Sequence, residues 1–190
     1  MNTAITPHQP HIVQGPGKSI DPSVVGQTMQ ELGVSSETID KTIIFVDPAN
    51  RLATNGITYP NRLGRLRHIA NPDLRNAKGP IVRLSTRVRG ADRSVEDMNV
   101  TLTHELEHVA QMDRRDTGLR IGHAAIWGLA TLGAVVGYHM GHSKASRIGL
   151  GISGMLIGHQ IGYKIAPHER QARSVANTVT TTAIHSHSSD

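Results

Sequence analysis

Two histidines and two glutamates share one short stretch of this 190-residue chain, which reads HELEH from His104 to His108. In an α-helix, residues four apart lie one turn apart, so both imidazoles would point the same way and could bind one zinc ion. Glu105 follows the first histidine directly and could take a proton from a water molecule on the metal. The stretch predicts His104 and His108 as metal ligands and Glu105 as the general base. The alternative is a surface helix whose side chains only contact one another at i,i+4.

The residues around this motif predict an amphipathic helix. Ser94 is a candidate N-cap, and Asp97 completes a plausible capping box with aspartate in place of the usual glutamate. Apolar residues then recur at spacings of 3, 4, 4 and 3 and form one stripe: Val95, Met98, Leu102, Leu106 and Val109. At ~100° per residue, this stripe and the histidine pair lie roughly a quarter-turn or more apart. The helix could therefore bury one side while its ligands line a cleft.

A catalytic zinc site needs a third protein ligand. At the spacing where metzincins carry a third histidine, this chain has Arg114, so the metzincin interpretation fails. Asp113 and Asp116 lie too close along the chain to fold back easily onto the pair. Glu169 is the better candidate for the third ligand.

Glu169 lies where a second helix is expected to begin. Pro167 is well placed at or just before a helix start, which puts Glu169 in the first turn. Ala172 and Ala176 share its face and would allow tight packing against the first helix. The alternative for Glu169 is a carboxylate that only interacts with the helix dipole.

These two segments resemble those of the gluzincin metallopeptidases. The stretch from Thr101 to Gln111 is similar to their active-site helix, and Glu169-x-x-Ala172 to their third-ligand helix. The resemblance covers about residues 81–176. The chain departs from the pattern at Arg173, where those peptidases usually show an aspartate. Within the group, the heat-shock and CAAX-processing membrane peptidases place membrane helices between the two segments.

The resemblance implies zinc, polypeptide substrates, and an upstream edge strand that binds the substrate as an added strand. The segment from Ile81 to Val88 is the expected strand, because it alternates between an apolar face and a basic face that water would wet. His168 or Tyr163 could stabilise an oxyanion near the metal. We expect about one zinc ion per chain.

The composition excludes several classes of site. The chain has no cysteine, which excludes disulfide scaffolds, thiolate nucleophiles, iron–sulfur clusters and cysteine-based zinc fingers. A net charge of +5 permits contact with anionic lipid or nucleic acid. Nucleic acid is the weaker expectation because no aromatic platform is interleaved with the arginines that could contact it: Arg62, Arg65, Arg67, Arg83 and Arg87.

A glycine-rich apolar pair of segments separates the two candidate ligand segments. Residues 121–143 and 148–163 contain no Asp, Glu, Lys or Arg. Glycines recur every four residues in each, at Gly133, Gly137 and Gly141 and at Gly154, Gly158 and Gly162. Such spacing lets two helix backbones approach closely, as in membrane helices, and could also assemble copies of the chain into a homo-oligomer.

The first segment is long enough to cross a bilayer, since 23 residues span about 34 Å as a helix. The second is shorter and could cross only with help from flanking Arg147 and Lys164. Membrane insertion is favoured, and the excess of positive charge at the ends of the pair puts the catalytic part in the cytoplasm. The alternative is a soluble cytoplasmic protein with a tightly packed helical hairpin.

Together these patterns predict an α+β chain with a zincin-like catalytic unit and an inserted glycine-zipper hairpin. We expect a flexible arm over 1–20, the catalytic unit over 21–120 and 164–182, the hairpin over 121–163, and a flexible tail over 183–190. The predicted function is a zinc-dependent endopeptidase. The alternative is a non-enzymatic membrane protein that assembles through its glycine zippers and retains a vestigial or structural metal site.

Overall fold

The computed structural model describes residues 8–13, 18–47, 55–60, 74, 76–88, 90–179 and 183–186. Over these residues the chain is α+β, with six helices and three small sheets. It divides into two compact units, Met1–Arg114 with Val175–Asp190, and Arg115–Ser174. The expected hairpin over 121–163 lies within the second unit.

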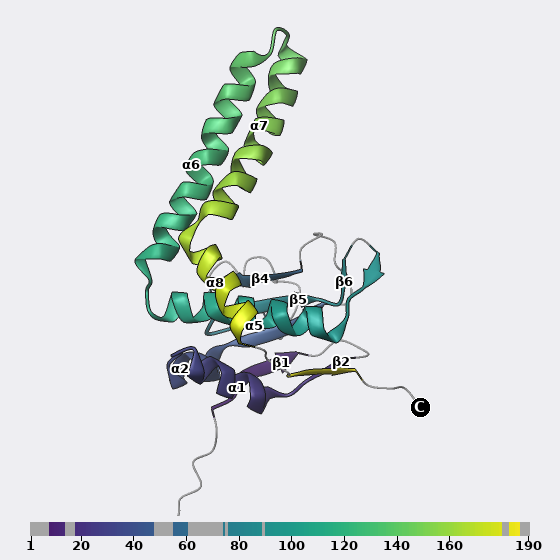
Figure 1. Ribbon diagram of the computed structural model, residues 1–190, viewed down its shortest axis with the longest axis vertical. Helices are drawn as coiled ribbons and strands as arrows, with labels where there is room; N and C mark the ends of the chain where they lie inside the picture. Colours follow the sequence, from purple (N-terminus) through teal and green to yellow (C-terminus); the bar gives the residue numbers. More distant parts are fainter. Residues whose placement is uncertain are drawn as a thin grey trace, which may run out of the picture. The chain divides into compact units, whose positions relative to one another are not determined.

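A four-stranded mixed sheet forms the centre of the first unit (Figure 1). Its order is β1 (His11–Val13), β3 (Ile43–Asp47), β5 (Ile81–Ser85) and β4 (Gly56–Tyr59). β1, β3 and β5 run parallel, and β4 is antiparallel to β5. β3 and β5 are therefore the inner strands, and β4 is an edge strand.

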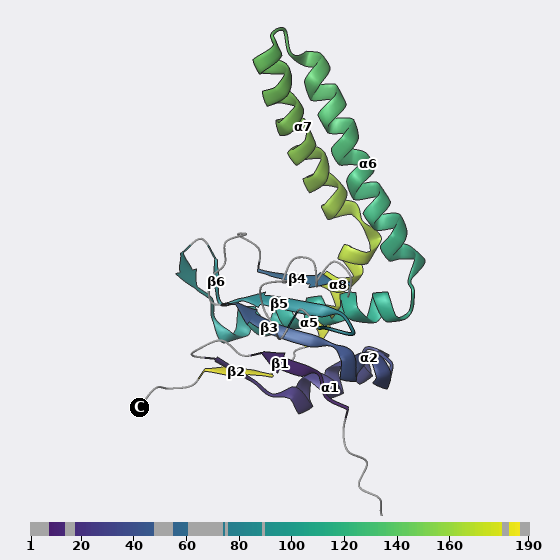
Figure 2. The same cartoon turned by 180° about the vertical axis from the view of Figure 1, so that it is seen from behind.

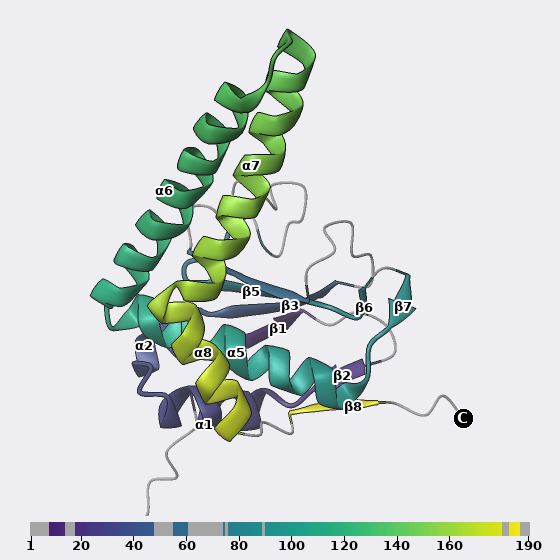
Figure 3. The same ribbon diagram turned by 45° about the horizontal axis from the view of Figure 1, so that its top comes forward.

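This order corrects the expectation that 81–88 forms one half-wet edge strand. β5 ends at Ser85, and β6 (Arg87–Val88) turns back to pair with β7 (Ala91–Asp92) (Figure 3). β5 is also paired on both sides, by β3 and β4. Among the described strands, the edges of this sheet are β1 and β4, and β4 is the edge strand next to β5.

Both faces of β5 are covered, which explains why the expected wet face is mostly buried. Val82 and Leu84 join the main core, as their alternation predicts. On the other face, Ile81 packs in a second cluster with Leu74 and Ala77. The remaining basic side chain on this face, Arg83, forms an ion pair with Asp47.

A second pair of strands joins the two ends of the chain. β2 (Lys18–Ile20) runs antiparallel to β8 (Ile184–Ser186). Asn99 on α5 donates to the Ile184 carbonyl and accepts from its amide, at 3.4 and 2.9 Å. The expected flexible arm and tail are therefore wrong for β1, β2 and β8. Each of these strands is short and pairs with a strand that is distant in the sequence, which local composition does not reveal.

Three helices pack with the sheet in the first unit: α1 (Pro22–Glu31), α2 (Ser36–Lys41) and α5 (Val95–Asp113) (Figure 2). Asp21 caps α1, and Ser94 caps α5 by accepting from the Asp97 amide at 3.1 Å. The N-cap of α5 is thus confirmed, while the Asp97 carboxylate bonds to Arg93. The predicted stripe of α5 is buried at Met98, Leu102, Leu106 and Val109, with Val95 partly buried against the same core.

Asp113 ends α5 and ties this helix to the start of α2. Its carboxylate accepts from the Ser35 amide at 2.7 Å, from the Ser35 hydroxyl at 3.0 Å and from the Thr38 hydroxyl. Burial acts to raise the pKa of Asp113, but these hydrogen bonds and the nearby Arg114 outweigh it and lower the pKa. Asp113 therefore has a structural role, consistent with its rejection as a metal ligand.

The second unit is a long helical hairpin, followed by the start of a third helix. α6 (Thr117–Met140) and α7 (Lys144–Ile165) run side by side, and α8 (Pro167–Thr178) begins directly after them. Glycines line the contact between α6 and α7. A Cβ added at Gly133 would lie 2.0 Å from the Gly154 carbonyl oxygen, and one at Gly158 would lie 2.0 Å from the Leu129 carbonyl oxygen.

The predicted close approach of the two helix backbones is thus confirmed within one chain. Side chains larger than glycine at these positions would force the helices apart. α6 is long and apolar enough to cross a membrane, by its length and composition, and it alone meets that test among the described helices. The hairpin also exposes large apolar side chains on both helices: Ile121, Trp127, Leu132, Val135, Val136 and Met140 on α6, and Ile148, Leu150, Ile152, Leu156, Ile157 and Ile161 on α7.

Candidate metal centre

The two motif histidines lie on successive turns of α5 and face the same way. Their ring centroids are 4.8 Å apart, with the rings nearly perpendicular. His108 is buried and His104 is half-buried. The structure therefore presents the imidazole pair as the i,i+4 spacing predicts.

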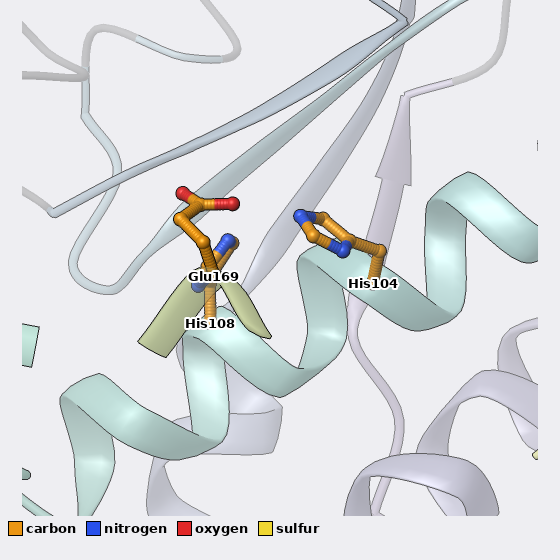
Figure 4. A group of neighbouring side chains, drawn as sticks. All are labelled: His104, His108 and Glu169. Atoms are coloured by element: carbon orange, nitrogen blue, oxygen red, sulfur yellow. The ribbon is translucent and has the colours of Figure 1, made fainter. Parts of the chain in front are cut away.

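Glu169 completes a group of three that could hold a metal ion (Figure 4). The ligand atoms of His104, His108 and Glu169 all lie within 4.8 Å of one another. Glu169 comes from the first turn of α8 and is buried. Figure 4 shows its carboxylate beside the two imidazoles of α5.

The chemistry of this donor set fits zinc. Two imidazole nitrogens and one carboxylate oxygen are ligand types that zinc accepts, and catalytic zinc sites use three protein ligands with a fourth position for water or substrate. Magnesium and calcium prefer sets made entirely of oxygen. The residues present therefore suit zinc better than either hard cation.

Glu105 lies on the same helix and is held by the edge strand of the sheet. The Thr58 hydroxyl lies 2.7 Å from one carboxylate oxygen of Glu105 and 3.1 Å from its backbone carbonyl oxygen. A Cβ added at Gly56 would lie 3.0 Å from Glu105 Cγ and 2.7 Å from Thr101. Strand β4 thus packs closely against α5, and Thr58 orients the expected general base.

Sequence reasoning missed Thr58 and a second partner of the site, Gln111. Thr58 lies 47 residues before Glu105, and no local pattern connects the two. The Gln111 side-chain oxygen lies 3.0 Å from Nδ1 of His108. Its position could have been recognised, because a residue three after a helical ligand lies on the same face.

His168 is buried next to Glu169, with Nε2 3.5 Å from the nearer carboxylate oxygen. Its ring lies against the start of α6, where a Cβ at Gly122 would come within 1.9 Å of Nδ1. The His123 ring is also close, with centroids 5.0 Å apart. His168 is therefore fixed in place, and its oxyanion role stays a prediction.

Arg173, which departs from the gluzincin pattern, joins the end of α7 to α8. It donates to the carbonyl oxygens of Glu169, at 3.2 Å, and Tyr163, at 3.0 Å. Its guanidinium also lies over the Tyr163 ring, 5.4 Å from the centroid. Tyr163 is 38% exposed, and its oxyanion role stays a prediction too.

Comparison with protein-family models, curated proteins and solved structures found no match for this chain.

Proposed function

We propose that this protein is a zinc-dependent endopeptidase that hydrolyses peptide bonds in extended polypeptides. The observation that carries the proposal is the group formed by His104, His108 and Glu169, next to which α5 also presents Glu105. A structural metal site needs no glutamate beside its ligands, whereas a hydrolytic site needs a general base close to the metal. The resemblance of both segments to gluzincins supports the same interpretation.

Each residue has a distinct role in this proposal. His104, His108 and Glu169 hold the zinc, which when bound supplies a Lewis acid and lowers the pKa of a coordinated water. Glu105 accepts the proton of the attacking water and then passes it to the leaving amine. Thr58 keeps the Glu105 carboxylate in one orientation through its hydroxyl.

Strand β4 is the proposed binding edge for the substrate. Among the described strands it pairs only with β5, so its other edge has no partner strand in that part of the chain. It also contacts α5 at Glu105, which would bring an added strand close to the general base. A polypeptide bound by strand addition must be extended, so unfolded chains are the expected substrates.

The proposed activity predicts metal-dependent cleavage. The purified full-length protein in detergent should cleave an unstructured casein, lose this activity on treatment with a chelator, and regain it when zinc is added back. Gel electrophoresis of the products measures the result, and a tightly folded protein of similar size is the control substrate that should resist. Cleavage that survives complete removal of the metal would contradict the proposal.

The hairpin favours a membrane location, which we propose with the catalytic residues on the cytoplasmic side. α6 has the length and hydropathy for a span, and the hairpin helices expose many large apolar side chains. In water this surface would be costly, whereas lipid would cover it. Both the crossing by α7 and the sidedness depend on the charge pattern of the sequence.

Membrane insertion predicts resistance to extraction with alkaline carbonate. Leu132 on α6 is 58% exposed, and a charge in the middle of a span is costly. We expect the unmodified chain to remain in the membrane pellet and Leu132→Lys to shift mostly to the supernatant. Ala145→Lys, which adds the same charge at the exposed start of α7, is the control and should stay in the pellet. Complete release of the unmodified chain would favour the soluble hairpin.

The same exposed surface supports the alternative function, a non-enzymatic membrane protein whose metal site is structural. Bound zinc with no cleavage of any extended polypeptide would favour this alternative. The glycines described above pack between α6 and α7 of one chain, and assembly of several copies through them stays a prediction.

Nucleic acid remains the weakest expectation, since Arg83 is paired with Asp47 and Arg87 with Asp92. Arg62, Arg65 and Arg67 lie outside the described residues.

A further inference from the structure

We propose that Gln111 is a positioning residue that fixes the tautomer of His108, so that His108 presents Nε2 to the metal. This inference rests on the proposed zinc site and adds to it a chain of side chains that holds one ligand ready. All its members lie on α5 or at its C-terminal cap.

The chain of contacts runs along one face of the helix. Nδ1 of His108 lies 3.0 Å from the Gln111 oxygen, and the Gln111 amide nitrogen donates to Glu107 at 3.4 Å. Arg114 donates to the same Glu107 oxygen at 2.8 Å. Arg114 is itself anchored, because it also donates to the Leu32 carbonyl at the end of α1, at 2.8 Å.

The chemistry of these groups gives the chain a single direction. Arginine can only donate, and a carboxylate only accepts, so Glu107 accepts from Arg114 and must also accept from Gln111. The amide nitrogen of Gln111 therefore faces Glu107, and its oxygen faces His108. An amide oxygen only accepts, so Nδ1 of His108 must carry the proton.

The consequence for the metal site is direct. A neutral imidazole with its proton on Nδ1 keeps the lone pair of Nε2 free, and a lone pair is what a metal binds. Hydrogen bonds of this kind to the second ring nitrogen set the orientation of histidine ligands and raise their basicity. This series of hydrogen bonds would thus hold His108 in the tautomer that binds the metal before the metal arrives.

Burial makes this arrangement costly unless its partners are in place. Gln111 is fully buried and Glu107 is 2% exposed, on a helix that also buries an apolar stripe and several other polar side chains. A buried amide or carboxylate without partners destabilises a protein. A buried apolar residue at position 111 would avoid that cost, so the polar chain is better explained by its effect on His108 than by packing alone.

The tautomer can be tested without activity or metal. In zinc-free full-length protein with ¹⁵N-labelled histidine, long-range proton–nitrogen spectra distinguish the two tautomers at about two pH units above the ordinary histidine pKa of ~6.5. We expect His108 to be protonated on Nδ1, and Gln111→Met to shift it toward the other tautomer. Protonation on Nε2 in the unmodified protein would overturn the inference.

Zinc affinity gives the second readout, measured by competition with a chelating dye. Gln111→Met keeps the approximate volume but removes the hydrogen bonds, and we expect it to weaken zinc binding by roughly 10- to 100-fold. In the exchanged double variant, Gln111→Glu with Glu107→Gln, position 111 still offers an acceptor to Nδ1 of His108. The amide at position 107 can donate to position 111, and the net charge is unchanged. We expect this exchange to restore affinity to within about threefold, which a role in packing alone would not require.

The outcomes separate this inference from the proposed function. If Gln111→Met binds zinc as tightly as the unmodified protein and keeps its tautomer, the positioning role is wrong and the zinc site stands. If the unmodified protein binds no zinc, the proposed function is wrong, while the tautomer measurement still decides the role of Gln111. Should Gln111→Met fail to fold, the exchanged variant and the unmodified protein carry both measurements.

Discussion

Replacing Glu105 with glutamine is expected to lower cleavage of an unstructured polypeptide by a factor on the order of 10² or more, while about one zinc ion per chain remains bound. The reason is that, in the proposed mechanism, Glu105 removes a proton and does not hold the metal. Glutamine has nearly the same shape but cannot act as a base. Its side-chain oxygen can still accept from the Thr58 hydroxyl, so the contact with β4 survives.

The isosteric change is needed because the site is tightly packed. Gly56 approaches both Thr101 and Glu105, so a shorter or bulkier residue at position 105 would disturb the packing of β4 on α5. The matched control is Glu96→Gln, the same chemical change at an exposed position in the first turn of α5. It should leave cleavage unchanged.

The measurement pairs zinc content, by mass spectrometry of the metal, with cleavage rates for the same preparations. Equal cleavage by Glu105→Gln and by the unmodified protein would mean that the base lies elsewhere or that a contaminant is responsible. Loss of zinc in Glu105→Gln would mean that Glu105 contributes to holding the metal.

Features encoded by local spacing were predictable from the sequence. The Ser94 cap and the apolar stripe of α5 depend on residues within one or two helical turns of each other. The same is true of the glycines, which recur every four residues within each helix. Gly133 of α6 and Gly154 of α7 meet in the hairpin. The candidate metal ligands on α5, His104 and His108, follow from a spacing of four residues.

Features that depend on distant partners were not predictable in the same way. Ile81 and Ser85 look like the wet face of a strand because their alternation is local, but Leu74 and Ala77 help to cover that face. Likewise, Ile184 lies in a polar tail that pairs with Lys18–Ile20 near the other end of the chain. Strand order and edge position come from such long-range pairing. The alternation of 81–88 therefore predicts an edge strand, although β5 is an inner strand of the sheet.

The site shows the same division. His104, Glu105 and His108 are defined by one helical motif, whereas Thr58 reaches Glu105 through the pairing of β4 beside β5. Gln111 lies between these cases. Its spacing places it on the face of His108, but the direction of its amide depends on Glu107 and Arg114 together.

Replacing Glu169 with alanine is expected to remove most of the bound zinc, and cleavage with it. Outer-shell changes typically cost about 10- to 100-fold in metal affinity, and loss of a direct ligand should exceed that range. His104 and His108 would remain, but two ligands are one fewer than catalytic zinc sites use. This pattern differs from Glu105→Gln, which should lose activity and keep the metal.

Glu96→Ala is the matched control for Glu169→Ala, because it deletes the same side chain at an exposed position of α5 and should keep about one zinc per chain. Helix content from circular dichroism should be equal in both variants, since α8 keeps Pro167 at its start and gains a strong helix former at position 169.

A folded Glu169→Ala protein with full zinc content would reject Glu169 as the third ligand. The histidine pair would then need another partner, and the similarity of Glu169-x-x-Ala172 to the gluzincin third-ligand helix would no longer support a peptidase. Loss of zinc in Glu169→Ala alone, with Glu96→Ala unaffected, would instead tie α8 to the metal site through a single carboxylate.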